Sequence, residues 1–183
     1  MDFGSIKLTT ERLKLRRLNS VDAESLFTIY SNNQVMKYWS SPPFTAVWQA
    51  NELISNSIKW WEGGESICLA VEELTSSKVI GTVSLFNFHQ ESKRAEIGYI
   101  LGYPYWGRGF MIEALTKVIE FSFSDLFLNR LEADIDPENA ASAKLLTRLR
   151  FSLEGRLRQR WIVNGNISDS EVYGLLRDDW KDG

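Results

Sequence analysis

The sequence is poor in the residues that carry several common kinds of catalysis. Its 183 residues include one histidine, His89, and one cysteine, Cys68. Ser-His-Asp triads, Cys-His pairs and histidine-rich zinc sites need a histidine positioned by a third group, and nothing in "FNFHQESKR" supplies one. We therefore expect His89 in a loop or at a strand end, and no metal site. Cys68 has no internal disulfide partner, and its setting in "SICLAVEE" favours a packed strand residue over a nucleophile.

The chain also lacks a long apolar run and an excess of basic residues. No segment approaches the roughly 20 apolar residues that a spanning helix requires, and "MDFGSIKLTTERLKLRRL" lacks the apolar core of a signal peptide. The formal net charge of -3 argues against nucleic acid as the main partner. We expect a cytoplasmic protein without a membrane partner. The length and a hydrophobic content of 44% suit one domain, 1–183.

Hydrophobic periodicity predicts a mixed α/β chain without repeats or linkers. Helices are expected at 19–33, where Ser20 is the candidate cap, and at 45–62, 110–124 and 137–151. Strands are expected at 12–18, 66–73, 78–88, 94–101, 130–136, 155–163 and 170–180, with the last two joined by an Asn-Gly turn. Alternation in the strand at 94–101 gives it two faces, one with Ala95, Ile97, Tyr99 and Leu101 and the other with Glu96, Gly98 and Ile100.

A glycine-rich stretch, "GYPYWGRGFMIEA", joins this strand to the next helix. Glycine allows positive φ, so consecutive N–H groups can turn toward one point, and the helix start adds unpaired donors that suit a phosphate. A structural tight turn explains the stretch equally well. Ile112 stands where a dinucleotide-binding fingerprint needs glycine, and no Gly-Lys-Ser/Thr follows, so neither that fingerprint nor a P-loop is present.

A second polar feature opens the helix at 137–151. Asn139 is its expected cap, and Ser142 follows three positions later on the same face as three leucines. Ser142 should thus point inward in the first turn. A small polar side chain satisfied near a helix start is the plainer interpretation.

Five ordered blocks of the chain together resemble the GNAT superfamily of acyl-CoA-dependent N-acetyltransferases. The resemblance is to the branch that includes the ribosomal-protein N-terminal acetyltransferases RimJ and RimL. It covers nearly the whole chain, and its blocks are "LTTERLKLRRL", "RAEIGYIL", "PYWGRGFMIEAL", "LNRLEADIDPENAASAKLLTRLRF" and "EGRLRQRWIVNGNISDSEVYGLL". Two positions depart from the family pattern: Arg150 stands where a glycine usually precedes Phe151, and Pro104 where the wider superfamily is often basic.

The resemblance implies an α/β (α+β) fold with a central mixed, mostly antiparallel sheet flanked by helices. A splayed strand pair would form the acyl-CoA cleft. Acetyl-CoA would be the cosubstrate, with its pyrophosphate in a loop made by Trp106, Gly107, Arg108, Gly109, Phe110 and Met111. Its pantetheine arm would pair with the strand edge at Ile100 and Leu101, and Asn139 and Ser142 would contact the arm and the sulfur.

The resemblance also implies direct attack of an amine on the thioester. Glu96 is the candidate proton acceptor, directly or through water, unless it is only a solvated strand carboxylate. A backbone N–H near Ile100 would polarise the acetyl carbonyl. Ser142 is the candidate proton donor to the thiolate; Tyr173 is the alternative, unless it merely packs.

The acceptor stays open at this stage. It is an amine, either the N-terminus of a protein, such as a ribosomal protein, or a small amine such as an antibiotic or polyamine. A non-catalytic CoA-binding sensor is the remaining alternative, and relatives include monomers and homodimers. The aromatic residues that wall the acceptor cleft or pack in the core are Tyr38, Trp39, Trp48, Trp60 and Trp61.

Overall fold

One eight-stranded sheet organises the molecule, which we describe from a computed structural model over residues 3–4 and 6–181. The strand order is β1-β2-β3-β4-β5-β6-β8-β7. Every neighbouring pair is antiparallel except β5 and β6, which run parallel. The strands are β1 Lys7–Thr9, β2 Leu13–Arg17, β3 Ile67–Glu73, β4 Lys78–His89, β5 Arg94–Leu101, β6 Arg130–Ile135, β7 Ser152–Val163 and β8 Asn166–Leu176. The mixed, mostly antiparallel sheet expected from the sequence is confirmed.

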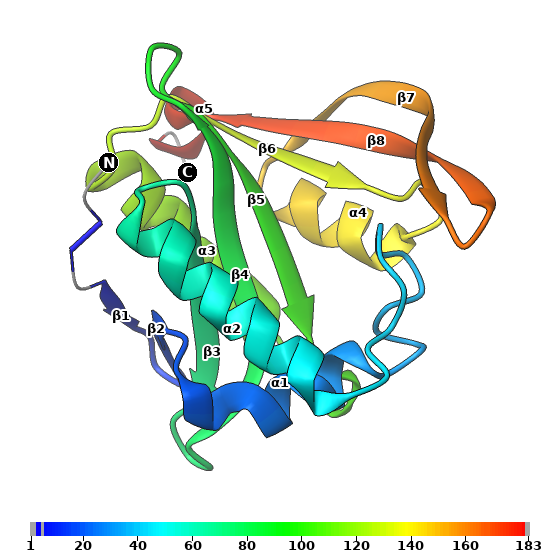
Figure 1. Cartoon of the computed structure of the whole chain (residues 1–183). Helices are drawn as coiled ribbons and strands as arrows, with labels where there is room; N and C mark the ends of the chain where they lie inside the picture. The colour runs from blue at the N-terminus through cyan, green and yellow to red at the C-terminus, as the bar shows by residue number, and fades with distance from the viewer. Residues whose placement is uncertain (1–2, 5, 182–183) are drawn as a thin grey trace.

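Helices cover both faces of this sheet (Figure 1). The helix α1 (Ala23–Tyr30) and the helix α2 (Val47–Glu62) lie on one face, where they share a core with Ile100 of β5. The helices α3 (Phe110–Ser124) and α4 (Ala140–Arg148) pack into the core on the other face. Short elements complete the chain, namely the 3-10 turns η1 (Ser20–Asp22) and η2 (Tyr103–Tyr105) and the terminal helix α5 (Arg177–Lys181).

The alternation of β5 explains how one strand serves both cores. Ala95 and Ile97 are buried in the core beneath α3, whereas Ile100 is buried in the core beneath α1. A strand projects successive side chains to opposite faces, so Glu96 points to the side of Ile100. The two faces predicted from the sequence are therefore the faces that the sheet presents.

Several predicted boundaries are wrong: the strands predicted to begin at 155 and 170 begin at Ser152 and Asn166, and the helix predicted at 137–151 is shorter. The first helical segment is capped by Asn19, not Ser20, because the Asn19 Oδ1 atom accepts the Val21 N–H at 3.0 Å while the Asp22 carboxylate accepts the Asn19 N–H at 2.9 Å. The strand predicted at 170–180 ends at Leu176, and α5 follows. Two aspartates open α5, which suits the positive end of a helix dipole.

The parallel pair β5 and β6 separates soon after it begins. Only Arg94, Ala95 and Glu96 pair with β6, although β5 continues to Leu101 and β6 to Ile135. Figure 1 shows the two strands diverging from this shared start. On its other edge β5 stays paired with β4 as far as Leu101. We call the resulting opening between the two strands the fork.

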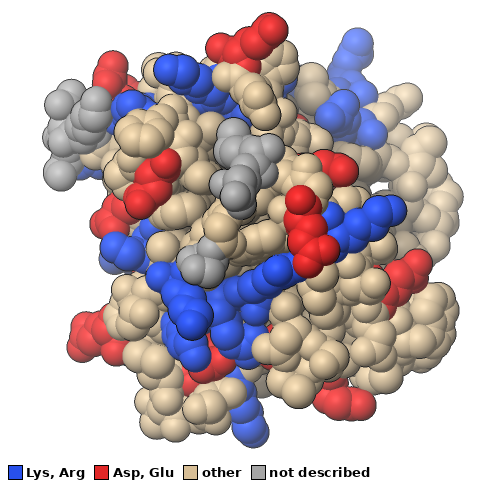
Figure 2. Space-filling model, turned by 60° about the vertical axis from the view of Figure 1, so that its left-hand side comes forward, with Lys and Arg blue, Asp and Glu red and all other residues tan. Residues whose placement is uncertain are grey.

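The surface carries charges of both signs. Figure 2 shows lysine and arginine side chains gathered on one face with aspartate and glutamate side chains beside them. Ion pairs join the N-terminal strands to their neighbours: Arg16 lies 2.6 Å from Glu72 and 2.8 Å from Asp22. Within the described residues, no helix is both long and apolar enough to cross a membrane.

Candidate active site

The fork exposes the main-chain edge of β5. The Gly102 N–H donates to the Ile80 carbonyl of β4 at 2.8 Å, and a Cβ built at Gly81 would collide with the Ile100 carbonyl oxygen. The main-chain groups of Ile100 therefore face β4. Because these groups alternate along a strand, those of Tyr99 and Leu101 face the fork.

The glycine loop begins where this edge ends. Gly107 and Gly109 have φ of +71° and +79°, and Gly109 is the N-cap of α3. Over the described residues, the N–H groups of 107–110 donate to no other protein group. The Trp106 indole anchors the loop by donating to the Leu101 carbonyl at 2.7 Å. The loop thus presents free donors at the positive end of a helix.

The arginine of the loop packs sideways. The Arg108 guanidinium lies 4.8 Å from the Phe110 ring centroid and 3.8 Å from the Glu73 carboxylate. Its carbonyl accepts a hydrogen bond from Arg12 at 3.0 Å, and Arg12 also pairs with Glu113 of α3 at 2.6 Å. These contacts tie the loop to the start of β2.

The start of α4 lies across the fork from β5. The Asn139 Oδ1 atom accepts the Ser142 N–H at 3.1 Å, as expected of a cap. The Ser142 side chain is buried, and its Oγ atom lies 2.6 Å from the Tyr99 hydroxyl oxygen, so the two hydroxyls share a hydrogen bond. Burial raises the pKa of Tyr99 to about 12, although the bond to Ser142 opposes the shift. Tyr99 is therefore protonated at neutral pH.

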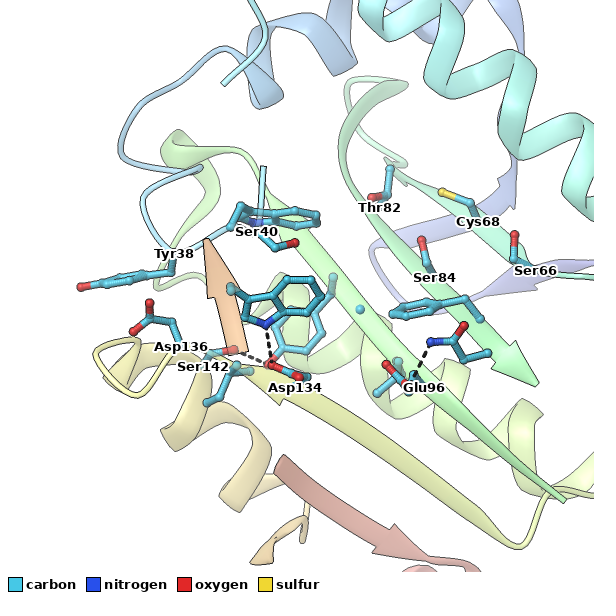
Figure 3. Close-up of a pocket in the computed structure, with 18 of the residues that line it drawn as sticks. Tyr38, Ser40, Ser66, Cys68, Thr82, Ser84, Glu96, Asp134, Asp136 and Ser142 are labelled. Carbon is cyan, nitrogen blue, oxygen red and sulfur yellow. Dashed lines mark hydrogen bonds between the residues drawn. The ribbon is translucent and has the colours of Figure 1, made fainter. Parts of the chain in front are cut away.

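A pocket of about 660 Å³ runs from this hydroxyl pair across the sheet face beneath α2. Glu96, Asn139 and Ser142 all line it, so the structure brings these three predicted residues together. The Glu96 Oε1 atom accepts from the Asn87 side-chain amide at 3.0 Å. Figure 3 shows the labelled Ser142 at one end of the pocket and Glu96 farther along it.

Acidic side chains outnumber basic ones along the pocket wall. The carboxylates are Glu65, Glu96, Asp134 and Asp136, and the one cation among the lining residues is Arg160. The Arg160 guanidinium lies 3.5 Å from Asp134, whose carboxylate also accepts the Trp161 indole N–H at 3.4 Å. The wall therefore favours a positively charged ligand.

Tyr173 lies outside this pocket. Its side chain is 6% exposed in the core beneath α3, and its hydroxyl donates to Glu171 at 3.2 Å.

Three of the five aromatic candidates, Tyr38, Trp39 and Trp60, line the pocket. Trp48 is 62% exposed and Trp61 packs in the core. Cys68 also lines the pocket and is half-buried, so its packing is less complete than the sequence suggested.

Sequence reasoning missed Tyr99, Asp134 and Arg160 as pocket residues. Tyr99 falls on the face of Ala95, which reads as core, and only the divergence of β6 frees its hydroxyl to meet Ser142. The position of Tyr99 could have indicated that it lies in the site, because it stands three residues before the glycine stretch, on the strand that resembles the family's splayed strand.

Comparison with known proteins decides the family. Residues 12–152 match the family described as an acetyltransferase (GNAT) domain. The chain belongs to the GNAT acetyltransferases. As a member, it is an N-acetyltransferase whose acyl donor is acetyl-CoA. The free donors of 107–110 and the open edge of β5 fit a diphosphate and an extended pantetheine arm.

Similar GNAT proteins act on different amines. The chain is 41% identical to an uncharacterized N-acetyltransferase, p20, of Bacillus licheniformis. The 172 aligned residues cover 93% of this chain and 96% of that one. It is 29% identical to the [ribosomal protein uS5]-alanine N-acetyltransferase of Escherichia coli, over 97% of this chain and 94% of that one. It is also 29% identical to the spermidine N(1)-acetyltransferase of Escherichia coli, over 86% and 82%.

A solved structure has the same fold. The ribosomal-protein-S5-alanine acetyltransferase of Vibrio fischeri superposes with a TM-score of 0.82 at 25% identity, over 96% of this chain and 98% of that one.

Arg150, which replaces the usual glycine of the GNAT pattern, adopts the backbone conformation that a glycine would have there. Arg150 takes φ of +67°, the left-handed region that a glycine would occupy, and the Phe151 N–H donates to the Leu146 carbonyl at 3.0 Å.

Proposed function

We propose that this N-acetyltransferase moves an acetyl group to a primary amine by direct attack within a ternary complex. The observation that carries the proposal is the Tyr99–Ser142 hydroxyl pair, which borders the fork and lines the same pocket as the Glu96 carboxylate. A proton donor and a proton acceptor thus lie along one cavity. Holding amine and thioester together in that cavity would supply much of the acceleration.

Acetyl-CoA would approach from the fork. Its diphosphate would take the N–H groups of 107–110, and its arm would pair with the main-chain groups of Tyr99 and Leu101. The main-chain groups of Ile100 already face β4, so the pairing falls on its two neighbours. This path leads the thioester toward Ser142.

The proton steps follow from the neighbours of each group. The attacking nitrogen forms a bond to the acetyl carbon, and its proton passes to Glu96, directly or through water. Collapse of the tetrahedral intermediate breaks the carbon–sulfur bond. The leaving thiolate takes a proton from the Ser142 hydroxyl, which the Tyr99 hydroxyl restores across their shared hydrogen bond. As the products leave, Glu96 releases its proton to solvent and Tyr99 takes one up, so that both groups return to their starting states. Tyr173 needs no role in this sequence.

The leading acceptor is the N-terminal amine of a protein, as for the uS5-alanine relative. A second candidate is a small polycationic amine, as for the spermidine relative. The excess of carboxylates on the pocket wall favours either kind of cation over a neutral acceptor.

A thiol-release assay tests the proposal. Purified protein with acetyl-CoA is screened against peptides with free N-termini and against small amines, and mass spectrometry locates the added acetyl group. Ser142→Ala should lower kcat by about 100-fold and leave the Kd for acetyl-CoA within about twofold, because the hydroxyl acts in the proton step. Full turnover by Ser142→Ala under chemistry-limited conditions would remove Ser142 as the acid.

A further inference from the structure

The inner end of the pocket is lined by uncharged polar side chains. Ser57 of α2, Cys68 of β3, and Thr82 and Ser84 of β4 all line it. The strand register sets Cys68 opposite Ser84 on one face of the sheet. Figure 3 shows Cys68, Thr82 and Ser84 grouped at the end of the pocket away from Ser142. We call these four side chains the polar floor.

Among the residues that the structure describes, one buried hydroxyl of the floor lacks a hydrogen-bond partner. Ser57 is 3% exposed, and within the described residues its Oγ atom has no hydrogen-bond partner. The Cys68 thiol, a weak hydrogen-bonding group, lies near the Ser57 hydroxyl but makes no hydrogen bond of ordinary geometry with it. An unpaired buried hydroxyl costs free energy, so such a group on a pocket wall indicates a partner that the ligand supplies.

The floor stays neutral at physiological pH. Burial raises the pKa of the Cys68 thiol, and burial also raises the pKa of Tyr30, whose hydroxyl lies 3.2 Å from the Thr82 Oγ1 atom. No carboxylate belongs to the floor itself, so a charged ligand group would lose its hydration there without a counter-ion. A hydroxyl or an amide is the kind of group that it can bind.

The floor lies close to the proposed base. Ser84 pairs with Gly98, and Glu96 is two residues along the same strand, so Ser84 and Glu96 are diagonal neighbours on one face. Such neighbours lie about 7–8 Å apart. Gly98 has no side chain of its own, and the Phe86 ring lies over it, 3.1 Å from where a Cβ of Gly98 would stand. Ser84, Phe86 and Glu96 all line the pocket, so a small molecule that lies across the Phe86 ring can reach Glu96 with its amine and Ser84 with a group a few bonds away.

We propose that the polar floor is an acceptor subsite for an uncharged hydrogen-bonding group, a hydroxyl or a carboxamide, that lies a few bonds from the reactive amine. This inference rests on the proposed function, which it narrows. It favours amines such as an N-terminal residue with its amide carbonyl or hydroxyl side chain. It disfavours simple diamines whose second ammonium would have to lie on the neutral floor.

Matched amines test the subsite by turnover. Threoninamide and valinamide differ by a hydroxyl in place of a methyl, and valinamide and isobutylamine differ by the carboxamide. With rates corrected for the free-amine fraction, the wild type should prefer the polar member of at least one pair by about tenfold in kcat/KM. The first pair identifies a hydroxyl and the second a carboxamide.

Serine variants locate the preference. Ser57→Ala and Ser84→Ala should each bring the wild-type ratio toward one. The matched control is Ser170→Ala, because Ser170 is also buried with an unpartnered Oγ atom but does not line the pocket. That variant should keep the wild-type ratio. Equal rates within both pairs, or ratios unchanged in both floor variants, would overturn the proposal.

The single cysteine gives a readout that needs no turnover. Alkylation of Cys68 by iodoacetamide, followed by mass spectrometry, should slow when an amine occupies the floor, and Cys68→Ser checks that no other residue is labelled. The preferred amine should protect at about one tenth the concentration of its apolar analogue. If none of the three amines slows alkylation, the subsite is refuted. If protection is seen without thiol release, the subsite stands and the proposed catalysis fails.

Discussion

Replacement of Gly107 by alanine separates the proposed cofactor role of the glycine loop from its structural role. Gly107 has φ of +71°, and a Cβ placed there would meet no atom within 4 Å. The substitution therefore introduces no clash within the protein. Its cost in the free protein comes from the backbone alone, since an L-residue in the left-handed region costs about 1–2 kcal/mol.

Two magnitudes follow from this geometry. The free energy of unfolding should fall by about 1–2 kcal/mol, which for a chain of this size lowers Tm by about 2–8 °C. If the loop relaxes to ease the strain, the N–H groups at 107 and 108 turn away from the diphosphate. Each hydrogen bond to a charged group contributes about 1.5–3 kcal/mol, so losing one raises the Kd for acetyl-CoA by about 10- to 150-fold.

The control is the equivalent change at the β7–β8 turn. Gly165 has φ of +81°, and a Cβ there also meets nothing within 4 Å. Gly165→Ala should therefore lower Tm by a similar amount and leave the Kd unchanged. Thermal unfolding and calorimetric titration with acetyl-CoA measure both quantities. Equal acetyl-CoA affinity for Gly107→Ala, Gly165→Ala and the wild type would refute the assignment of the loop.

Three further changes test the neighbouring groups. Tyr99→Phe should lower kcat by about tenfold with little change in the Kd for acetyl-CoA; unchanged kcat would show that Ser142 acts without it. Glu96→Gln should lower kcat/KM by about 100-fold at pH 7 and by less at high pH, where more amine is already free. A parallel pH–rate profile would exclude Glu96 as the base. Glu113→Gln should destabilise the fold by about 1 kcal/mol at pH 7, as urea unfolding can measure. Burial opposes the shift, but bonds from Thr10 and Arg12 hold the Glu113 pKa below its ordinary value, so this contribution is present above the unfolded pKa and disappears as the pH falls through the folded one. An equal loss at both pH 7 and pH 3 would contradict it.

Local sequence patterns predicted most of the fold, and the prediction failed where tertiary contacts determine the structure. The two faces of β5 follow from alternation alone, and the stripe along α3 follows from helical periodicity. The short strand Lys7–Thr9 escaped prediction because it exists only by pairing with β2. The choice between Asn19 and Ser20 as the cap depended on the position of Asp22, which also serves Arg16.

The site was less predictable because its parts come from distant segments. The contact between Asn139 and Ser142 could be predicted, since a helix cap and the third helical residue are close in sequence. The meeting of Tyr99 and Ser142 depends on the angle at which β6 leaves β5, which no local pattern encodes. The polar floor joins a helix and two strands. Each of its hydroxyls taken alone resembles an ordinary buried serine or threonine.

The fork divides recognition between two kinds of chemical group. In the proposed arrangement, backbone atoms of the fork and the glycine loop would bind the donor, whereas side chains of α2, β3 and β4 would bind the acceptor. Replacing a side chain leaves the peptide group in place. The side chains that line the acceptor pocket can therefore change over evolutionary time while the backbone contacts to acetyl-CoA are kept. Redesign toward new amines can therefore begin at the four positions of the polar floor without changing the part of the enzyme that binds acetyl-CoA.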